Sequence, residues 1–226
     1  MRSPAAADSD TVQVMVNARV VSVNRGREAD LIVAGKPART GINKQPVHGP
    51  VSVRLLGLPE DESADKENHG GRDQAVYAYA REDLDWWTEQ LGRELRNGQF
   101  GENITTAGLD ISAALIGEVW QLGEAVVQVT AARIPCVTFQ SWMDEPHWVK
   151  RFAAGRRPGA YLRVISEGTV RPGDDLTVLS RPEVPVTVAE SMAAFYGDRE
   201  IMARLLTVEG RGDKWDEIGA AVLTRA

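Results

Sequence analysis

The chain has little cysteine, little histidine and no long hydrophobic run. Its 226 residues include one cysteine, Cys136, and three histidines. A single cysteine excludes an internal disulfide and a cluster ligated by four cysteines of the same chain. His48, His69 and His147 lack the spacing of zinc ligands, and one cysteine does not complete such a site. No stretch approaches the roughly 20 apolar residues that a membrane-spanning helix needs.

Positive charge is also scarce. The 26 lysines and arginines against 32 acidic residues give a net charge of −6. This balance argues against a general binder of nucleic acid or anionic membranes, while a local basic pocket stays compatible with it. Residues 1–8 lack the apolar core of a signal peptide, and with the single cysteine this predicts a cytoplasmic protein.

Strand patterns dominate between residues 12 and 180. Many short strands without alternating helices favour a mainly β protein built on a closed or nearly closed barrel. A turn is expected at 24–26, and two helices are expected at 82–91 and 146–154. The expected strands cover residues 12–16, 18–23, 51–56, 75–79, 118–122, 125–131, 161–166 and 175–180.

The pattern changes after residue 182. Two prolines within 181–185 predict a stiff linker. Three short amphipathic helices follow, one after a capping-box pattern at Thr187 and the others after Asp198 and Asp213. So small an appendage is expected to pack on the barrel or on a second copy in a homodimer. The predicted division is a disordered tail over 1–11, a barrel domain over 12–182 and a three-helix appendage over 183–226.

Four polar segments stand at the ends of predicted strands. The first places Lys44 in a glycine turn, where a cation suits a phosphate or carboxylate ligand. The second places Asn68 and His69 before Gly70 and Gly71, whose backbone can approach a ligand closely. A solvated loop lysine and a hairpin turn with a surface histidine are the alternatives.

The third and fourth segments add an acid, an amide and the thiol. Gly101, Glu102 and Asn103 suit a ring with donor and acceptor edges, or else satisfy loop backbone groups. Arg133 precedes Cys136 by three residues, where it can stabilise a thiolate or bind a phosphate. The alternative is a buried, inert cysteine. Taken together, small residues and isolated polar groups at strand ends are typical of a ligand pocket at a barrel mouth.

In this order the segments resemble a known family. The chain is similar to the MOSC domain, and more narrowly to its stand-alone bacterial YiiM-like type. The resemblance covers about residues 12–182, and the tail resembles the "3-alpha" appendage of that group. The motifs are Thr-Gly-Ile-x-Lys-x-Pro-Val at 40–47, His-Gly-Gly-x-Asp-x-Ala-Val at 69–76, Gly-Glu-Asn at 101–103, Arg-x-Pro-Cys at 133–136, Gly-x-Tyr-x-Arg-Val at 159–164 and Gly-x-Val-x-x-Gly-Asp at 168–174.

The resemblance implies a barrel of the pyruvate-kinase type and a pyranopterin molybdenum cofactor whose metal is ligated by Cys136. Soft thiolate ligands suit such a centre. The catalytic residues that we expect are Cys136, which matches the family's position, and His69 and Asn68. The residues expected to bind the cofactor are Lys44, Gly70, Gly71, Gly101, Glu102, Asn103, Arg133, Tyr161 and Arg163.

One position departs from the family pattern. Members of this type commonly carry a second histidine where this chain has Asn68. An amide does not titrate near neutral pH, so Asn68 replaces that histidine only if its role is hydrogen bonding.

The activity implied is reduction of N-hydroxylated compounds such as hydroxylaminopurines or amidoximes. No flavin or iron–sulfur motif is present, so a separate electron-donor reductase is required. One alternative is non-redox cofactor binding, or a sulfur carrier with a persulfide on Cys136. Another is a barrel that binds a different anion. Pyridoxal phosphate is not supported, because the domain that binds it in related sulfurases has no counterpart in these residues.

Overall fold

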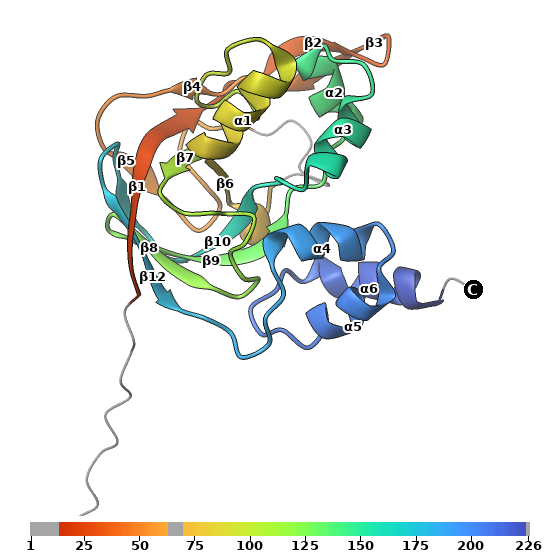
Figure 1. Cartoon of the computed structure of the whole chain (residues 1–226). Helices are drawn as coiled ribbons and strands as arrows, with labels where there is room; N and C mark the ends of the chain where they lie inside the picture. Colours follow the sequence, from red (N-terminus) through yellow and green to blue (C-terminus); the bar gives the residue numbers. More distant parts are fainter. Residues whose placement is uncertain (1–13, 63–69, 225–226) are drawn as a thin grey trace, which may run out of the picture.

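A closed β-barrel forms the centre of the computed structural model, which describes residues 14–62 and 70–224 (Figure 1). The barrel strands are β1 (Val14–Arg25), β6 (Val76–Ala80), β7 (Ile104–Ala107), β8 (Val119–Leu122), β9 (Ala125–Ala132), β10 (Ala160–Ser166) and β12 (Asp175–Ser180). They follow one another around the ring as β12-β8-β9-β10-β6-β7-β1, and pairing of β1 with β12 closes it. Only the β6–β7 pair of this ring is parallel. The predicted fold class is confirmed.

Alternating apolar side chains fill the barrel. Along β9, Ala125, Val127 and Val129 are fully buried while the residues between them are half-buried. Trp120 on β8 is also fully buried in the same core. Burial of each large apolar side chain contributes about 1.5–3 kcal/mol, so this period-two pattern both predicts the strands and stabilises the closed sheet.

Helices and short strands cover one end of the barrel. The expected helix at 82–91 is α1 (Arg81–Leu91), and the one expected at 146–154 begins later, as α3 (Trp148–Gly155). The expected turn at 24–26 is wrong, because β1 continues through Arg25 and pairs there with β4 (Gln45–Pro46). The sequence patterns predicted neither the short helix at 137–143 nor the hairpin at 29–40. The remaining elements are β2 (Ala29–Val33), β3 (Lys36–Thr40), β4 (Gln45–Pro46), β5 (Val51–Val53), η1 (Arg72–Gln74), α2 (Val137–Met143) and β11 (Gly168–Val170).

A second apolar cluster joins these helices to β6. Phe100 lies edge-on to Phe139 of α2 at 5.3 Å between ring centres, and Trp87 of α1 stacks on Phe152 of α3 at 5.9 Å. Tyr79 of β6 packs on Phe100 at 5.0 Å. Aromatic pairs of this kind add about 0.5–1.5 kcal/mol each beyond the area that they bury. The cluster therefore fixes α2, and with it the segment that carries Cys136.

The C-terminal appendage consists of α4 (Val188–Phe195), α5 (Arg199–Leu205) and α6 (Lys214–Thr224). The predicted capping box at Thr187 is present, and Asp198 caps α5 by accepting from the Ile201 amide at 3.0 Å. Ser191 of α4 accepts a hydrogen bond from the Ala132 amide of β9 at 3.2 Å. The appendage thus packs on the barrel (Figure 1). No helix within the described residues is long and apolar enough to cross a membrane.

Candidate functional site

A cavity of about 180 Å³ lies at the end of the barrel, next to the start of α2. Since one water needs about 10–15 Å³, the cavity admits an organic ligand rather than a single solvent molecule. Gly71, Glu102 and Arg163 do not line it. Asn68 and His69 lie outside the described residues. The predicted residues that do line it are Lys44, Gly70, Gly101, Asn103, Arg133, Cys136 and Tyr161.

Cys136 is the residue immediately before α2. Its backbone is extended, with φ −123° and ψ 172°, and its carbonyl accepts a hydrogen bond from the Gln140 amide at 3.1 Å. The residue is half-buried and contributes to the cavity wall. It is therefore not enclosed in the core, and a ligand in the cavity can reach this residue.

Arg133 is a buried cation beside Cys136. It is 4% exposed, and its guanidinium lies 3.6 Å from the centre of the Phe139 ring and 5.5 Å from that of Tyr77. One nitrogen donates to the Phe100 carbonyl at 3.3 Å. None of the ion pairs among the described residues involves Arg133. A buried charge without a counter-charge is costly, so this wall favours an anionic ligand.

The other two predicted cations are already neutralised. The Lys44 ammonium contacts the Asp61 carboxylate, and these side chains are only 10% and 14% exposed. Arg163 pairs with Asp73 at 2.6 Å, away from the cavity lining. Among the three expected cations, Arg133 alone therefore keeps its charge available to a ligand within the part of the chain that the structure describes.

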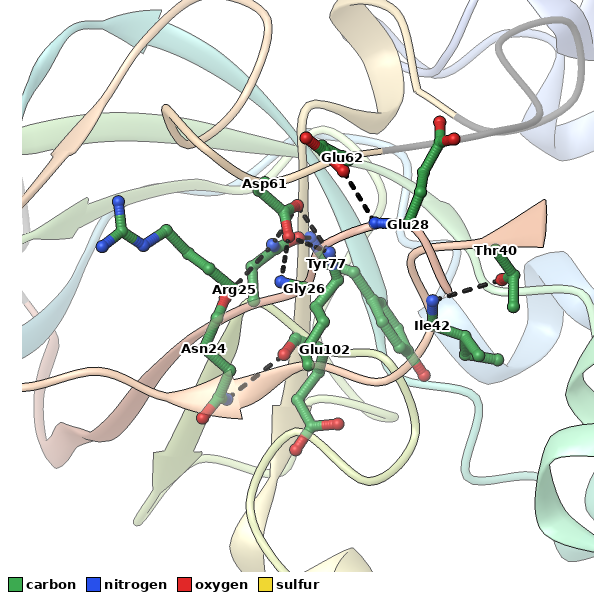
Figure 2. Close-up of polar contacts among 12 residues, drawn as sticks. Asn24, Arg25, Gly26, Glu28, Thr40, Ile42, Asp61, Glu62, Tyr77 and Glu102 are labelled. Carbon is green, nitrogen blue, oxygen red and sulfur yellow. Dashed lines mark hydrogen bonds and ion pairs between the residues drawn. The ribbon is translucent and has the colours of Figure 1, made fainter. Parts of the chain in front are cut away.

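Asp61 is a central residue that the sequence analysis did not single out. Its carboxylate accepts from the Gly26 amide at 2.8 Å (Figure 2). It also accepts from the Asn103 side chain at 2.8 Å and from the Lys44 ammonium. Two segments of the chain lie very close together here: a Cβ added to Gly41 would lie only 1.9 Å from the Glu62 carbonyl oxygen. Asp61 joins three segments that are distant in sequence, and no local motif signals that role.

Hydrogen bonds within the protein occupy the Asn103 side chain more fully than its motif suggested. Its side-chain oxygen accepts from the Tyr77 amide at 3.0 Å, while its nitrogen donates to Asp61 and, at 3.4 Å, to the Asn24 carbonyl. Both amide hydrogens are thereby used. Asn103 shapes the cavity wall and has little hydrogen-bonding capacity left for a ligand.

Glu102 stabilises the neighbouring turn by accepting hydrogen bonds from its backbone. It is fully buried and accepts from the Gly98 amide, from the Phe100 amide at 3.0 Å and from the Thr105 hydroxyl at 3.0 Å. Burial raises the pKa of its carboxyl above the usual value, although these hydrogen bonds partly offset the rise. Glu102 therefore positions the Phe100 segment of the cavity wall without touching the cavity.

The raised pKa of Glu102 predicts a pH-dependent stability contribution. Because the folded-state pKa lies above the unfolded one, this contribution is present below the unfolded pKa of about 4.3 and is lost as pH rises through the folded pKa. The free energy of unfolding of the wild type, measured by urea denaturation, should rise relative to Glu102→Gln as pH falls from 7 towards 4.5. A difference that stays constant over this range would show that Glu102 has no raised pKa.

Two tyrosines complete the wall around Arg133. The rings of Tyr77 and Tyr161 lie 5.3 Å apart. Burial raises the pKa of both hydroxyls, and the Arg133 charge opposes that rise. Both side chains thus remain neutral at physiological pH. The Tyr77 hydroxyl donates to the Pro158 carbonyl at 2.7 Å.

Cys136 and the buried Arg133 both line a cavity of this β-barrel, and comparison with known proteins gives the class to which the chain belongs. The family model for the MOSC domain matches residues 65–177, and the chain is a member of this family. It is 37% identical to the "Uncharacterized protein YflK" of Bacillus subtilis over 199 residues, which cover 87% of this chain and 90% of that protein.

Two further relatives extend the comparison. The solved structure of YiiM from Geobacillus stearothermophilus aligns with a TM-score of 0.77 and 28% identity, covering 92% of this chain and all of that one. A protein named "Reductase" from Gibberella moniliformis is 31% identical over 152 residues, which are 66% of this chain but only 27% of that protein. The stand-alone form of the family is thus the one that this chain matches along most of its length.

Proposed function

We propose that the protein binds a pyranopterin molybdenum cofactor in this cavity and reduces N-hydroxylated compounds of the hydroxylaminopurine or amidoxime kind. The observation that carries the proposal is that Arg133 and Cys136 line the same cavity. An uncompensated buried guanidinium suits an anionic phosphate, and a thiol beside it suits a soft metal. The family membership and the reductase named among the relatives support the same assignment.

The surrounding residues fit a metal that arrives with its own ligands. Within the described residues, no group of three or more histidine, cysteine, aspartate or glutamate side chains comes together. In the proposed complex, Cys136 would supply the protein ligand and the cofactor would supply most of the others. When bound, the cofactor supplies the redox chemistry of N–O bond cleavage.

The reaction sets requirements that the chain meets only in part. Replacing an N–OH bond with N–H releases water and consumes two electrons and two protons. The electrons come from a separate reductase protein. Tyr161 lines the same cavity as Arg133, and its neutral hydroxyl is suited to orienting a polar substrate. Arg133 fixes the anionic end of the cofactor, and the aromatic rings around it limit access of water.

The proposal is tested on protein purified from a host that makes the cofactor. We expect it to contain molybdenum, to release a fluorescent pterin oxidation product, and to reduce benzamidoxime to benzamidine with a reduced viologen as electron donor. A stable persulfide on Cys136, detected by mass spectrometry in protein without reductase activity, would instead support a sulfur carrier. Absence of both metal and pterin after reconstitution with cofactor contradicts the proposal.

A further inference from the structure

Gln74 presents a polar atom that the fold leaves unused. The residue lies in η1 and lines the cavity. Its side-chain oxygen is buried and accepts no hydrogen bond from the described residues. Buried polar atoms in folded proteins are nearly always paired, so an exception on a cavity wall points to a partner supplied by a ligand.

Asp73 fastens the segment that carries Gln74 to β9, β10 and the C-terminal appendage. One Asp73 carboxylate oxygen accepts from Arg163 Nε at 2.7 Å, and the other accepts from the Asp213 amide at 2.6 Å. The Asp73 carbonyl also accepts from the Thr130 hydroxyl of β9. Asp213 immediately precedes α6, so one carboxylate joins β10, the appendage and the cavity segment.

Asp73 and Gln74 are neighbours in a single turn but have different contacts: Asp73 binds the barrel and the appendage, whereas Gln74 lines the cavity. Gly71 enters the turn with φ 78°, a conformation that favours glycine, and its carbonyl accepts from the Gln74 amide at 3.3 Å. With Asp73 held from the appendage side, the neighbouring Gln74 side chain contributes to the cavity wall. The appendage thereby takes part in building the site without reaching into it.

We propose that Gln74 is a ligand-contacting residue whose oxygen accepts a hydrogen bond from an N–H group, and that Asp73 is its positioning residue. The identity of the ligand rests on the proposed function, because both the pterin and an N-hydroxylated substrate carry N–H groups. The shared chemistry is an N–H donor on a planar nitrogen compound.

The test compares two changes at Gln74 with one control. Gln74→Met keeps the length and removes the acceptor, whereas Gln74→Glu keeps an acceptor. Gln121→Met is the matched control, since Gln121 bonds the Gly123 carbonyl in the β8–β9 hairpin and does not line the cavity. Binding of benzamidoxime to the full chain, with and without cofactor, is measured by calorimetry, and pterin retention is measured by fluorescence.

Gln74→Met should weaken either benzamidoxime binding or pterin retention by about 5- to 150-fold, the range expected for one lost buried hydrogen bond. Loss of benzamidoxime binding assigns the N–H to the substrate, and loss of pterin assigns it to the cofactor. Gln121→Met should retain both, and Gln74→Glu should retain binding of the uncharged benzamidoxime because it keeps an acceptor. Equal losses in Gln74→Met and Gln74→Glu, or no loss in either, would overturn the assignment.

Asp73→Asn tests the positioning role through a different readout. Hydrogen exchange should accelerate at the amides of 70–76 and at Asp213 together, and ligand binding should weaken in the same direction as in Gln74→Met. Asp174→Asn, which disrupts a pair with Arg171 away from the cavity, is the control. Faster exchange near Asp213 alone overturns the positioning role. If the wild type binds benzamidoxime but holds no molybdenum, the proposed function fails while the Gln74 assignment stands.

Discussion

Replacing Cys136 with alanine is expected to abolish molybdenum retention while leaving the fold intact. Among the described residues that line the cavity, Cys136 offers the thiol that suits a soft metal, and it lies half-buried immediately before a short helix. Loss of residues that only support a metal ligand costs about 10–100-fold in affinity, so loss of the ligand itself should cost at least about 100-fold. Elemental analysis of the purified variant measures the effect.

Two controls make this result specific to the thiol. The unfolding free energy of Cys136→Ala should change by less than about 1.5 kcal/mol, because the residue is not enclosed in the core. Val137→Ala, at the exposed next position, should keep its metal. Wild-type amounts of molybdenum in Cys136→Ala would show that another residue ligates the metal.

Replacing Arg133 with methionine should separate ligand binding from stability. The buried guanidinium has no ion pair among the described residues, so its charge is available to an anionic ligand. We expect a loss of about 2–5 kcal/mol in cofactor binding, the cost of removing one partner of a buried charge pair. The cofactor-free variant should unfold at the same or a higher urea concentration than the wild type, because an uncompensated buried charge is removed.

The matched control is Arg171→Met, which removes an arginine that is 68% exposed and paired with Asp174. It should bind cofactor as the wild type does, since exposed ion pairs contribute little. Arg133→Lys should keep part of the binding, because the charge remains while the planar fork is lost. If Arg133→Met destabilises the cofactor-free protein and leaves binding unchanged, Arg133 has a structural role only.

Local patterns predicted much of the fold. The alternation along β9 and the capping signals at Thr187 and Asp198 are set by neighbours in sequence, and the structure confirms them. Helix α2 was not predicted, because a seven-residue helix has too few turns for a clear periodicity. The aromatic packing of Phe139 holds it instead.

The motifs predicted the cavity better than they predicted the roles within it. The motifs predicted that Cys136 and Arg133 share one site, and both line the cavity. They did not reveal that Arg163 pairs with Asp73, or that Asp61 neutralises Lys44. Each of these pairs joins residues far apart in sequence, so only the folded chain brings them into contact. Glu102 and Asn103 were also expected at the ligand. Hydrogen bonds instead commit Asn103 to the cavity wall and Glu102 to the turn behind it.

X-ray absorption at the molybdenum edge of the wild-type protein tests the central claim most directly. The pyranopterin dithiolene contributes sulfur neighbours to the metal, and Cys136 on the cavity wall would add one more. We predict one sulfur neighbour beyond the dithiolene pair at a bonding distance. Dithiolene sulfurs alone, in protein that holds molybdenum and pterin in equal amounts, would contradict ligation by Cys136.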